Sequence, residues 1–215
     1  MLLKYKGTYW NLFYFLLKNS LTKRYTKEEA QILMKDTKVI YKNMLEETDD
    51  IGDNNPMASN IYASYVFIAL WKASKGKISI EELRSITQEL MNLGILKTVA
   101  GCVDVNKPSH MKKLENKLKN SAKWVDENPK YKDITWDFNF DSKKHEQGFY
   151  YHFTKCPIEK YCREHDLLEV LPVMCDIDFL SAKLVHATLY REQTLAKGGD
   201  KCDYWFVGDK SEIQN

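Results

Sequence analysis

Apolar residues in the first half of the chain recur at helical spacing. Thr26 and Glu29 have the spacing of a capping box, and apolar residues follow them at Ile32, Leu33, Val39, Ile40 and Leu45. The stretch from about residue 56 to 75 is the richest in apolar side chains. We therefore expect it to be the most buried helix, with Asn55 as its cap and Gly76 at its end.

Two more helices are expected before the pattern changes. Ser79 and Glu82 form a second capping-box pattern, which begins a helix that Gly94 can close. The Lys- and Asn-rich segment from His110 to Pro129 predicts a further helix that ends before the proline. Its many charges indicate a face in contact with water rather than a partner site.

The second half changes to a period of two, which is typical of strands whose two faces differ. The run TWDFNFD alternates aromatic and polar residues, and GFYYHFTKC repeats the alternation with Phe149, Tyr151 and Phe153. Helices are predicted over 156–171 and 175–187. A hairpin over 189–206, with glycines at its turn, completes the chain.

Helices followed by strands predict an α+β fold: a helical N-terminal half packed on a small antiparallel sheet of about four strands with inserted helices. The chain has 215 residues and is 44% hydrophobic, which suffices for one well-buried core. We expect a single domain over 1–215. Within it, 1–100 would form a helical layer and 130–210 the α+β part that carries the site.

Charge and cysteine content narrow the functional classes. The 32 basic and 30 acidic residues leave a net charge of +2, which disfavours nucleic-acid binding through phosphate neutralisation. The five cysteines are an odd number, and no secretory signal is recognisable. These features predict free thiols in a reducing compartment, which we take to be the cytoplasm.

The apolar segment from Tyr9 to Asn19 has a continuous apolar part too short for a membrane span, which takes roughly 20 residues. We expect no membrane crossing and a helix that packs on the core. Two alternatives stay open, a helix at a membrane surface and a helix that joins two copies into a homo-oligomer.

Three cysteines stand where chemistry is expected. Cys156 precedes Pro157, so its thiol should lie at a helix N-terminus, where the helix dipole lowers the thiol pKa. Cys175 is also near a predicted helix start. Cys202 and Asp203 are neighbours in the last strand and therefore point to opposite faces. The alternative is that each thiol is a small buried hydrophobe. That reading is preferred for the two remaining cysteines, Cys102 and Cys162.

The sequence contains no clear motif for a metal site or a nucleotide site. Cys156, Cys175 and Cys202 could bind a metal with His152 or His165, but the chain contains no CxxC pair and no HExxH. The glycine-rich nucleotide loops and the GxSxG elbow are also missing from the sequence. We expect neither a metal nor another cofactor.

Arg191 lies between Tyr190 and Glu192, within the first strand of the predicted hairpin. From a rigid strand, its guanidinium could fork onto the carboxylate of a small substrate. The alternative is a structural salt bridge to a cross-strand acid such as Asp203. Thr194 follows nearby, on the other pleat face if the strand is regular.

Residues 149–206 bring several of these features together in a fixed order. An aromatic strand leads into Cys156-Pro157, and Asp178 follows Cys175 three positions later. Further along come Arg191 and Thr194, then Gly198-Gly199-Asp200 and Cys202-Asp203. This combination resembles the L-2-amino-thiazoline-4-carboxylic acid hydrolase family, and the resemblance covers about the last 60 residues well and the helical half loosely.

The resemblance implies hydrolysis of a thiazoline ring that bears a 2-amino group and a carboxylate, with N-carbamoyl-cysteine as the product. Cys175 could be the nucleophile and Asp178 its base or the partner of the amidine. Arg191 could bind the carboxylate. The other implied site residues complete the pocket: Cys202 and Asp203 as catalytic groups, and Thr194, Asp200 and Cys156 as substrate contacts. Whether a cysteine or a water molecule attacks stays open.

Two alternatives to a hydrolase stay open. The same cysteine-lined pocket could belong to a small-molecule binding or sensory module without turnover. The aromatic N-terminal helix could instead make the chain an interaction protein.

Overall fold

The computed structural model describes residues 1–94, 97–98 and 101–212. Its helices are α1 Gly7–Leu21, α2 Lys27–Glu46, α3 Ala58–Ala73, α4 Ile80–Met91, α6 Pro108–Glu127, α7 Pro157–Glu164 and α8 Leu171–Leu184. Its strands are β1 Asn139–Phe140, β2 Phe149–Phe153, β3 Ala187–Tyr190 and β4 Cys202–Gly208. The strands form one antiparallel sheet in the order β1-β2-β4-β3. The predicted α+β fold is confirmed.

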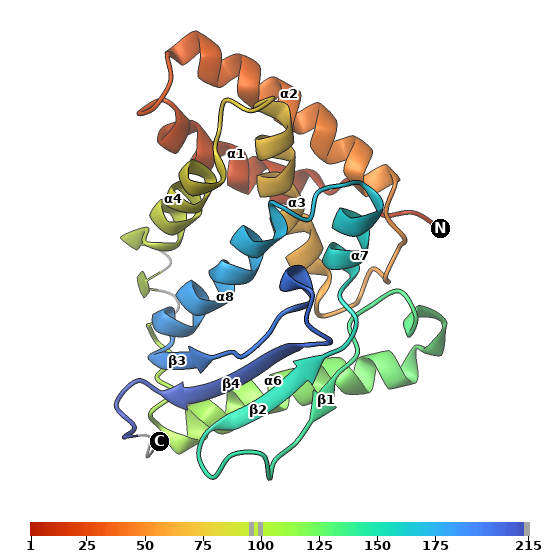
Figure 1. Cartoon of the computed structure of the whole chain (residues 1–215), viewed down its shortest axis with the longest axis vertical. Coiled ribbons are helices and arrows are strands. Elements are labelled where there is room, and N and C mark those ends of the chain that lie inside the picture. Colours follow the sequence, from red (N-terminus) through yellow and green to blue (C-terminus); the bar gives the residue numbers. More distant parts are fainter. Residues whose placement is uncertain (95–96, 99–100, 213–215) are drawn as a thin grey trace.

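The helical half and the sheet are joined by α8. Figure 1 shows α1 to α4 at one end of the molecule, the sheet at the other, and α8 running from the helices towards β3. An ion pair between Arg84 of α4 and Asp176 of α8 links the two parts. The single-domain organisation stays a prediction, which the number of unfolding transitions would test.

Helix α3 is the most buried helix, as predicted, because its apolar residues surround the helix instead of forming one stripe. It begins at Ala58, later than expected. Asn55 acts in the turn before it, where its side-chain oxygen accepts a hydrogen bond from the Met57 N–H at 2.9 Å. After the helix, Lys75 and Gly76 have φ values of 51° and 86°, which end it as the glycine predicted.

The two predicted capping boxes have different outcomes. Thr26 and Glu29 exchange both hydrogen bonds, so the first box is confirmed. Ser79 caps the Glu82 N–H, but the Glu82 carboxylate accepts from the Tyr25 hydroxyl at 2.7 Å, so the return bond to Ser79 is replaced. The helix that follows ends at Met91, before Gly94 is reached.

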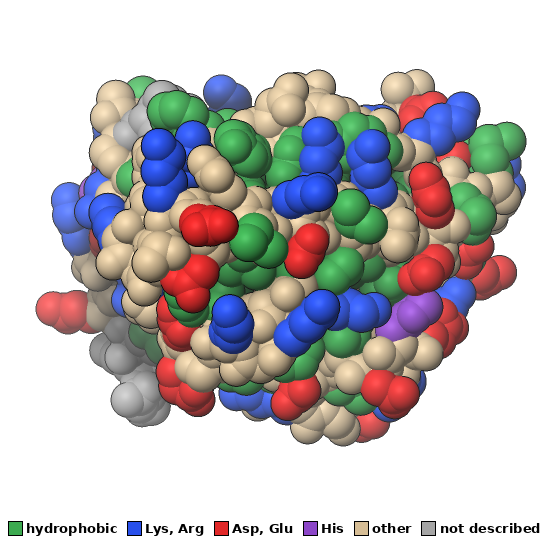
Figure 2. All heavy atoms as spheres, turned by 90° about the horizontal axis from the view of Figure 1, so that it is seen from above, with side chains coloured by type: hydrophobic (Ala, Val, Ile, Leu, Met, Phe, Trp, Pro, Cys, Tyr) green, Lys and Arg blue, Asp and Glu red, His purple; other side chains and the backbone are tan. Residues whose placement is uncertain are grey.

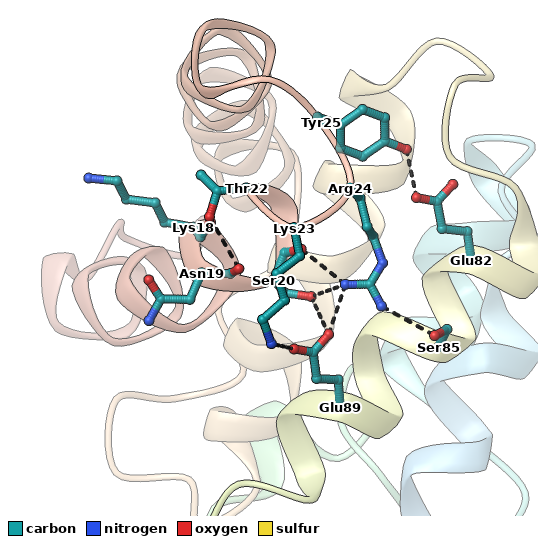
Figure 3. Close-up of polar contacts among 10 residues, drawn as sticks. All are labelled: Lys18, Asn19, Ser20, Thr22, Lys23, Arg24, Tyr25, Glu82, Ser85 and Glu89. Carbon is teal, nitrogen blue, oxygen red and sulfur yellow. Dashed lines mark hydrogen bonds and ion pairs between the residues drawn. The ribbon is translucent and has the colours of Figure 1, made fainter.

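A polar network joins the α1–α2 turn to α4. Figure 3 shows the Glu89 carboxylate at its centre, with Lys23, Arg24 and Ser20 as its partners. Arg24 donates to Glu89 at 2.8 Å and to the Ser20 hydroxyl at 2.8 Å. The network lies far along the chain from the candidate site and holds the helical layer together.

The N-terminal helix packs on the core through Trp10, Leu17 and Leu21, as predicted. Its other side leaves Leu12 and Phe15 58% and 67% exposed. No helix within the described residues is both long and apolar enough to cross a membrane. Seen from above, basic and acidic side chains are interspersed, with apolar patches between them (Figure 2).

The predicted alternation of the strands is confirmed. Tyr151 pairs with Tyr204 and Phe153 with Cys202, and these side chains join the main core. His152 pairs with Asp203 on the opposite face. Strand β1 is shorter than the run TWDFNFD suggests, because the Asp137 side chain accepts hydrogen bonds from the backbone N–H groups of the segment that follows β2.

Both predicted inserted helices have shifted bounds. Helix α7 ends at Glu164, where a left-handed Asp166 (φ 56°) turns the chain. Helix α8 begins at Leu171, earlier than the predicted Cys175, because Pro172 is tolerated in a first turn. Cys175 therefore lies inside the helix, not at its start.

The C-terminal hairpin is confirmed as β3 and β4. A short 3-10 turn, Leu195–Lys197, and a left-handed Gly198 (φ 80°) form part of the connection. Strand β3 ends at Tyr190, so Arg191 is the first residue of the connection and not a mid-strand residue as predicted.

Candidate functional site

An ion pair between Arg191 and Asp178 forms the centre of the candidate site. Nη2 of Arg191 lies 2.9 Å from Oδ2 of Asp178. The Arg191 side chain is 3% exposed, whereas Asp178 keeps 38% exposure. The pair is therefore open to solvent on the carboxylate side. The Asp203 carboxylate, which the sequence suggested as a partner for a structural salt bridge, does not take this place; Arg191 reaches only the backbone oxygen of Asp203.

The protein holds the Arg191 guanidinium on several sides. Nε donates to the backbone oxygen of Asp203 at 3.0 Å, and Nη1 donates to that of Cys175 at 3.1 Å. The guanidinium also lies 4.1 Å from the ring centroid of Tyr204 and 5.2 Å from that of Phe179. Such stacking suits a planar cation that has little contact with water.

Asp178 occupies the helical position that the sequence predicted, on the same helix as Cys175. Burial raises the pKa of the Asp178 carboxyl above its usual value, against the opposing effects of Arg191 and Tyr204. A carboxyl with a raised pKa is better matched to proton transfer near neutral pH.

Tyr204 is the residue of this site that sequence reasoning missed. Its hydroxyl donates to Oδ2 of Asp178 at 3.1 Å. Its ring stacks on Tyr151 with centroids 4.7 Å apart and planes 6° from parallel. Tyr204 follows Cys202 by two positions in the last strand, so alternation puts both on one face, and this is the signal that could have found it.

The three predicted site thiols have raised pKa values. Cys156 does lie at the N-cap of α7, but burial raises its pKa to about 12 and outweighs the helix N-terminus. The prediction of a lowered pKa there is wrong. Burial, followed by the nearby Asp178, raises the pKa of Cys175. Burial also raises the pKa of Cys202, whose sulfur accepts the Leu195 N–H at 3.3 Å. All three are protonated thiols at neutral pH.

The prediction that the other two cysteines are small buried hydrophobes is confirmed for Cys162, which is fully buried in α7. It is wrong for Cys102, whose side chain is exposed.

Asp203 lies on the outer face of the sheet and points away from Cys202. It is 2% exposed, and its carboxylate accepts hydrogen bonds from the backbone N–H groups of Glu192 and Gln193 at 3.1 and 2.9 Å. These bonds shape the connection that carries Arg191.

Thr194 and Asp200 are placed differently from each other. Thr194 is 5% exposed, and its hydroxyl has no hydrogen-bond partner among the described residues. Asp200 is exposed in the glycine turn, where its N–H donates to the Gln193 side chain at 3.0 Å. The structure thus brings Asp178, Arg191 and Tyr204 into direct contact, and leaves Asp200 at the surface.

Two further observations concern ligands. Over 1–94, 97–98 and 101–212, no three His, Cys, Asp or Glu side chains are arranged to hold a metal ion. A hollow of about 370 Å³ lies beside the C-terminal half of α8, and its walls include Met91, Leu180 and Leu184 but none of the candidate site residues.

Comparison with known families decides the relationship. The family model for L-2-amino-thiazoline-4-carboxylic acid hydrolase matches residues 59–206. The chain belongs to this family. The match runs from α3 to β4, so the resemblance extends well beyond the C-terminal part on which it was recognised. Comparisons with curated proteins and with solved structures give no match.

Proposed function

We propose that the protein hydrolyses a small cyclic amidine that carries a carboxylate, such as L-2-amino-thiazoline-4-carboxylate, to an N-carbamoyl amino acid. The observation that carries the proposal is the half-exposed Asp178 carboxylate, held by a buried Arg191 inside the region that matches the family. A protonated amidine is a planar cation with paired N–H donors, and a carboxylate is its natural partner.

The reaction needs a base near the amidine carbon. Asp178, with its raised pKa, accepts a proton from a water molecule as the oxygen adds to C2 of the ring. The bond from C2 to the ring sulfur then breaks, and the proton on Asp178 passes to the departing thiolate. As the carbonyl forms, the second proton of the water goes to the ring nitrogen, or to solvent if that nitrogen is already protonated. The product contains one water more than the substrate.

A covalent route through Cys175 is the second version of the same chemistry. The thiol would lose its proton to Asp178 and add to C2, the bond from C2 to the ring sulfur would break, and the proton would pass to the departing ring thiolate. Water would then displace the Cys175 sulfur from C2, which restores the thiol and releases the product. The raised pKa of Cys175 means that this thiol is protonated at rest, which favours direct attack by water.

The substrate carboxylate needs its own donors. Arg191 donates three of its five N–H groups to protein oxygens. We propose that its remaining N–H groups and the Thr194 hydroxyl receive the carboxylate, with Cys156 and Cys202 as apolar walls. Asp203 acts by shaping the Arg191 connection, and Asp200 contacts the substrate only from the rim.

The first test is mass spectrometry of the protein incubated with L-2-amino-thiazoline-4-carboxylate, with and without a chelator. We expect a product heavier by one water, formed equally in both arms. Asp178→Asn should lose turnover, while Glu146→Gln, at an exposed position of the loop before β2, should keep it. Absence of product from the wild type would contradict the proposed substrate, and loss of product only with chelator would contradict the metal-free version.

A binding or sensory module is the alternative, which the three protonated thiols and the enclosed Arg191 favour. It predicts that the thiazoline carboxylate raises the melting temperature of the protein without being consumed. If the wild type forms product, even slowly, and Asp178→Asn does not, the binding module is excluded.

A further inference from the structure

Two donors meet on one oxygen of Asp178. Nη2 of Arg191 and the hydroxyl of Tyr204 both bind Oδ2, at 2.9 and 3.1 Å. In the part of the chain that the structure describes, no donor binds Oδ1. With 38% of the side chain exposed, one oxygen is fixed by the protein and the other is left for a ligand.

The position of the Tyr204 hydroxyl is set by the sheet. Tyr204 lies in β4, between β2 and β3. Its ring is held by Tyr151 at 4.7 Å and by Phe153, edge-on, at 5.4 Å. The Arg191 guanidinium lies over the same ring. The ring therefore has little freedom, and the hydroxyl is aimed at Asp178 before any ligand arrives.

We propose that Tyr204 is a positioning residue of this site, which together with Arg191 holds Oδ2 of Asp178 so that Oδ1 faces the substrate. The inference rests on the proposed function, in which Asp178 accepts a proton or binds the amidine. It adds Tyr204 to the site and gives the two carboxylate oxygens of Asp178 different roles. Oδ2 is held by Arg191 and Tyr204, and Oδ1 acts on the substrate.

The titratable groups around Asp178 are Cys175 in its own helix, α8, and four residues from three other segments. These four are Arg191 after β3, Cys202 and Tyr204 in β4, and Tyr151 in β2. Burial keeps the phenols and the thiols protonated at neutral pH, so Arg191 is the charged neighbour. The Tyr204 hydroxyl stabilises the ionised carboxylate, because it donates to it. Removing that hydroxyl should make Asp178 harder to ionise.

Tyr204→Phe tests this inference, since it removes the hydroxyl and keeps the ring that stacks on Tyr151 and Arg191. We expect kcat to fall roughly 10-fold to 100-fold, which is the worth of one hydrogen bond to a charged group. The acid limb of the kcat/KM profile should also move to higher pH. If Tyr204 had no positioning role, the acid limb of Tyr204→Phe would stay at the pH of the wild type.

Tyr150→Phe is the matched control. Tyr150 lies in β2 with its hydroxyl buried and without a partner among the described residues, and it points to the face opposite Tyr151. It should leave both kcat and the acid limb unchanged. Equal effects of Tyr150→Phe and Tyr204→Phe would overturn the inference.

A readout without substrate separates this inference from the proposed function. The ¹³C carboxyl resonance of Asp178, assigned with Asp178→Asn, should titrate at higher pH in Tyr204→Phe than in the wild type. An unchanged midpoint overturns the role of Tyr204 even if the enzyme turns over. A raised midpoint in a protein that hydrolyses no thiazoline supports the positioning role and refutes the proposed substrate.

Discussion

Nη1 of Arg191 donates to the backbone carbonyl of Cys175 at 3.1 Å and so ties the end of β3 to the middle of α8. The same side chain reaches the backbone of Asp203 in β4 through Nε. Arg191 is thus a three-way junction between two strands and the helix that carries Asp178. Its planar fork satisfies three acceptors that lie in different directions, which the single ammonium of lysine would not reproduce.

Arg191→Lys should therefore destabilise the fold as well as the site. Loss of these buried hydrogen bonds to a charged donor should lower the free energy of unfolding by about 2–3 kcal/mol. Urea denaturation at pH 7 measures it. Arg163→Lys is the control, because Arg163 is 60% exposed in its pair with Glu159 and should change the free energy by less than about 0.5 kcal/mol. Equal stability of Arg191→Lys and the wild type would contradict the junction.

The raised pKa values of the site thiols predict slow alkylation. Cys156, Cys175 and Cys202 should resist iodoacetamide at pH 7.5 in the folded protein, because burial keeps them protonated. Cys102 is exposed and should react first. Peptide mass spectrometry over a time course resolves the four sites, and the same reaction in urea shows their intrinsic rates. Labelling of Cys175 as fast in the folded protein as in urea would show that the thiol is not protected.

Strand alternation predicted a good part of this site. A period of two predicts Cys202 and Tyr204 on one face and Asp203 on the other, without saying which face is the core; the structure confirms the alternation and puts Cys202 and Tyr204 on the core face. Family resemblance pointed to Asp178 and Arg191. Their direct contact could not be predicted, because it depends on how α8 packs against the end of β3, and no local pattern records that packing.

The errors have local physical causes. The helix start at Cys175 was wrong because a proline fits the first turn, so Pro172 lies inside α8 and not before it. The lowered pKa predicted for Cys156 is wrong because burial raises the pKa of the thiol by more than the helix N-terminus lowers it. The sequence shows that Cys156 stands at the N-terminus of a helix, but it does not show how deeply the thiol is buried.

The exposed side of α1 gives a test of self-association. Leu12 and Phe15 are 58% and 67% exposed, and they do not belong to the buried face formed by Trp10 and Leu17. If this side joins two copies, the double variant Leu12→Glu with Phe15→Glu should be monomeric while keeping its helical content. Size-exclusion chromatography with light scattering measures the mass. Val39→Glu, at a 54% exposed position of α2, is the control. A monomeric wild type would refute the homo-oligomer.

The Glu89 network should make stability depend on pH. Hydrogen bonds from Lys23 and then Arg24 lower the pKa of Glu89 from 4.5 to about 2. A carboxyl whose pKa is lowered by folding stabilises the protein above its unfolded pKa, and the contribution is lost as pH falls from about 5 through about 2. Because Lys23 is 66% exposed, solvent screening reduces the effect, and we expect Glu89→Gln to cost about 1 kcal/mol at pH 7.

Urea unfolding of the wild type and Glu89→Gln at a series of pH values provides the measurement. The difference in unfolding free energy should be full at pH 6–7, shrink below pH 5, be mostly lost near pH 2, where the folded carboxyl is about half protonated, and vanish only at lower pH. Glu127→Gln removes an exposed pair with Lys123 and should show no pH-dependent difference. A difference for Glu89→Gln that stays constant down to pH 2 would mean that the carboxylate charge contributes nothing and that the effect comes from packing alone.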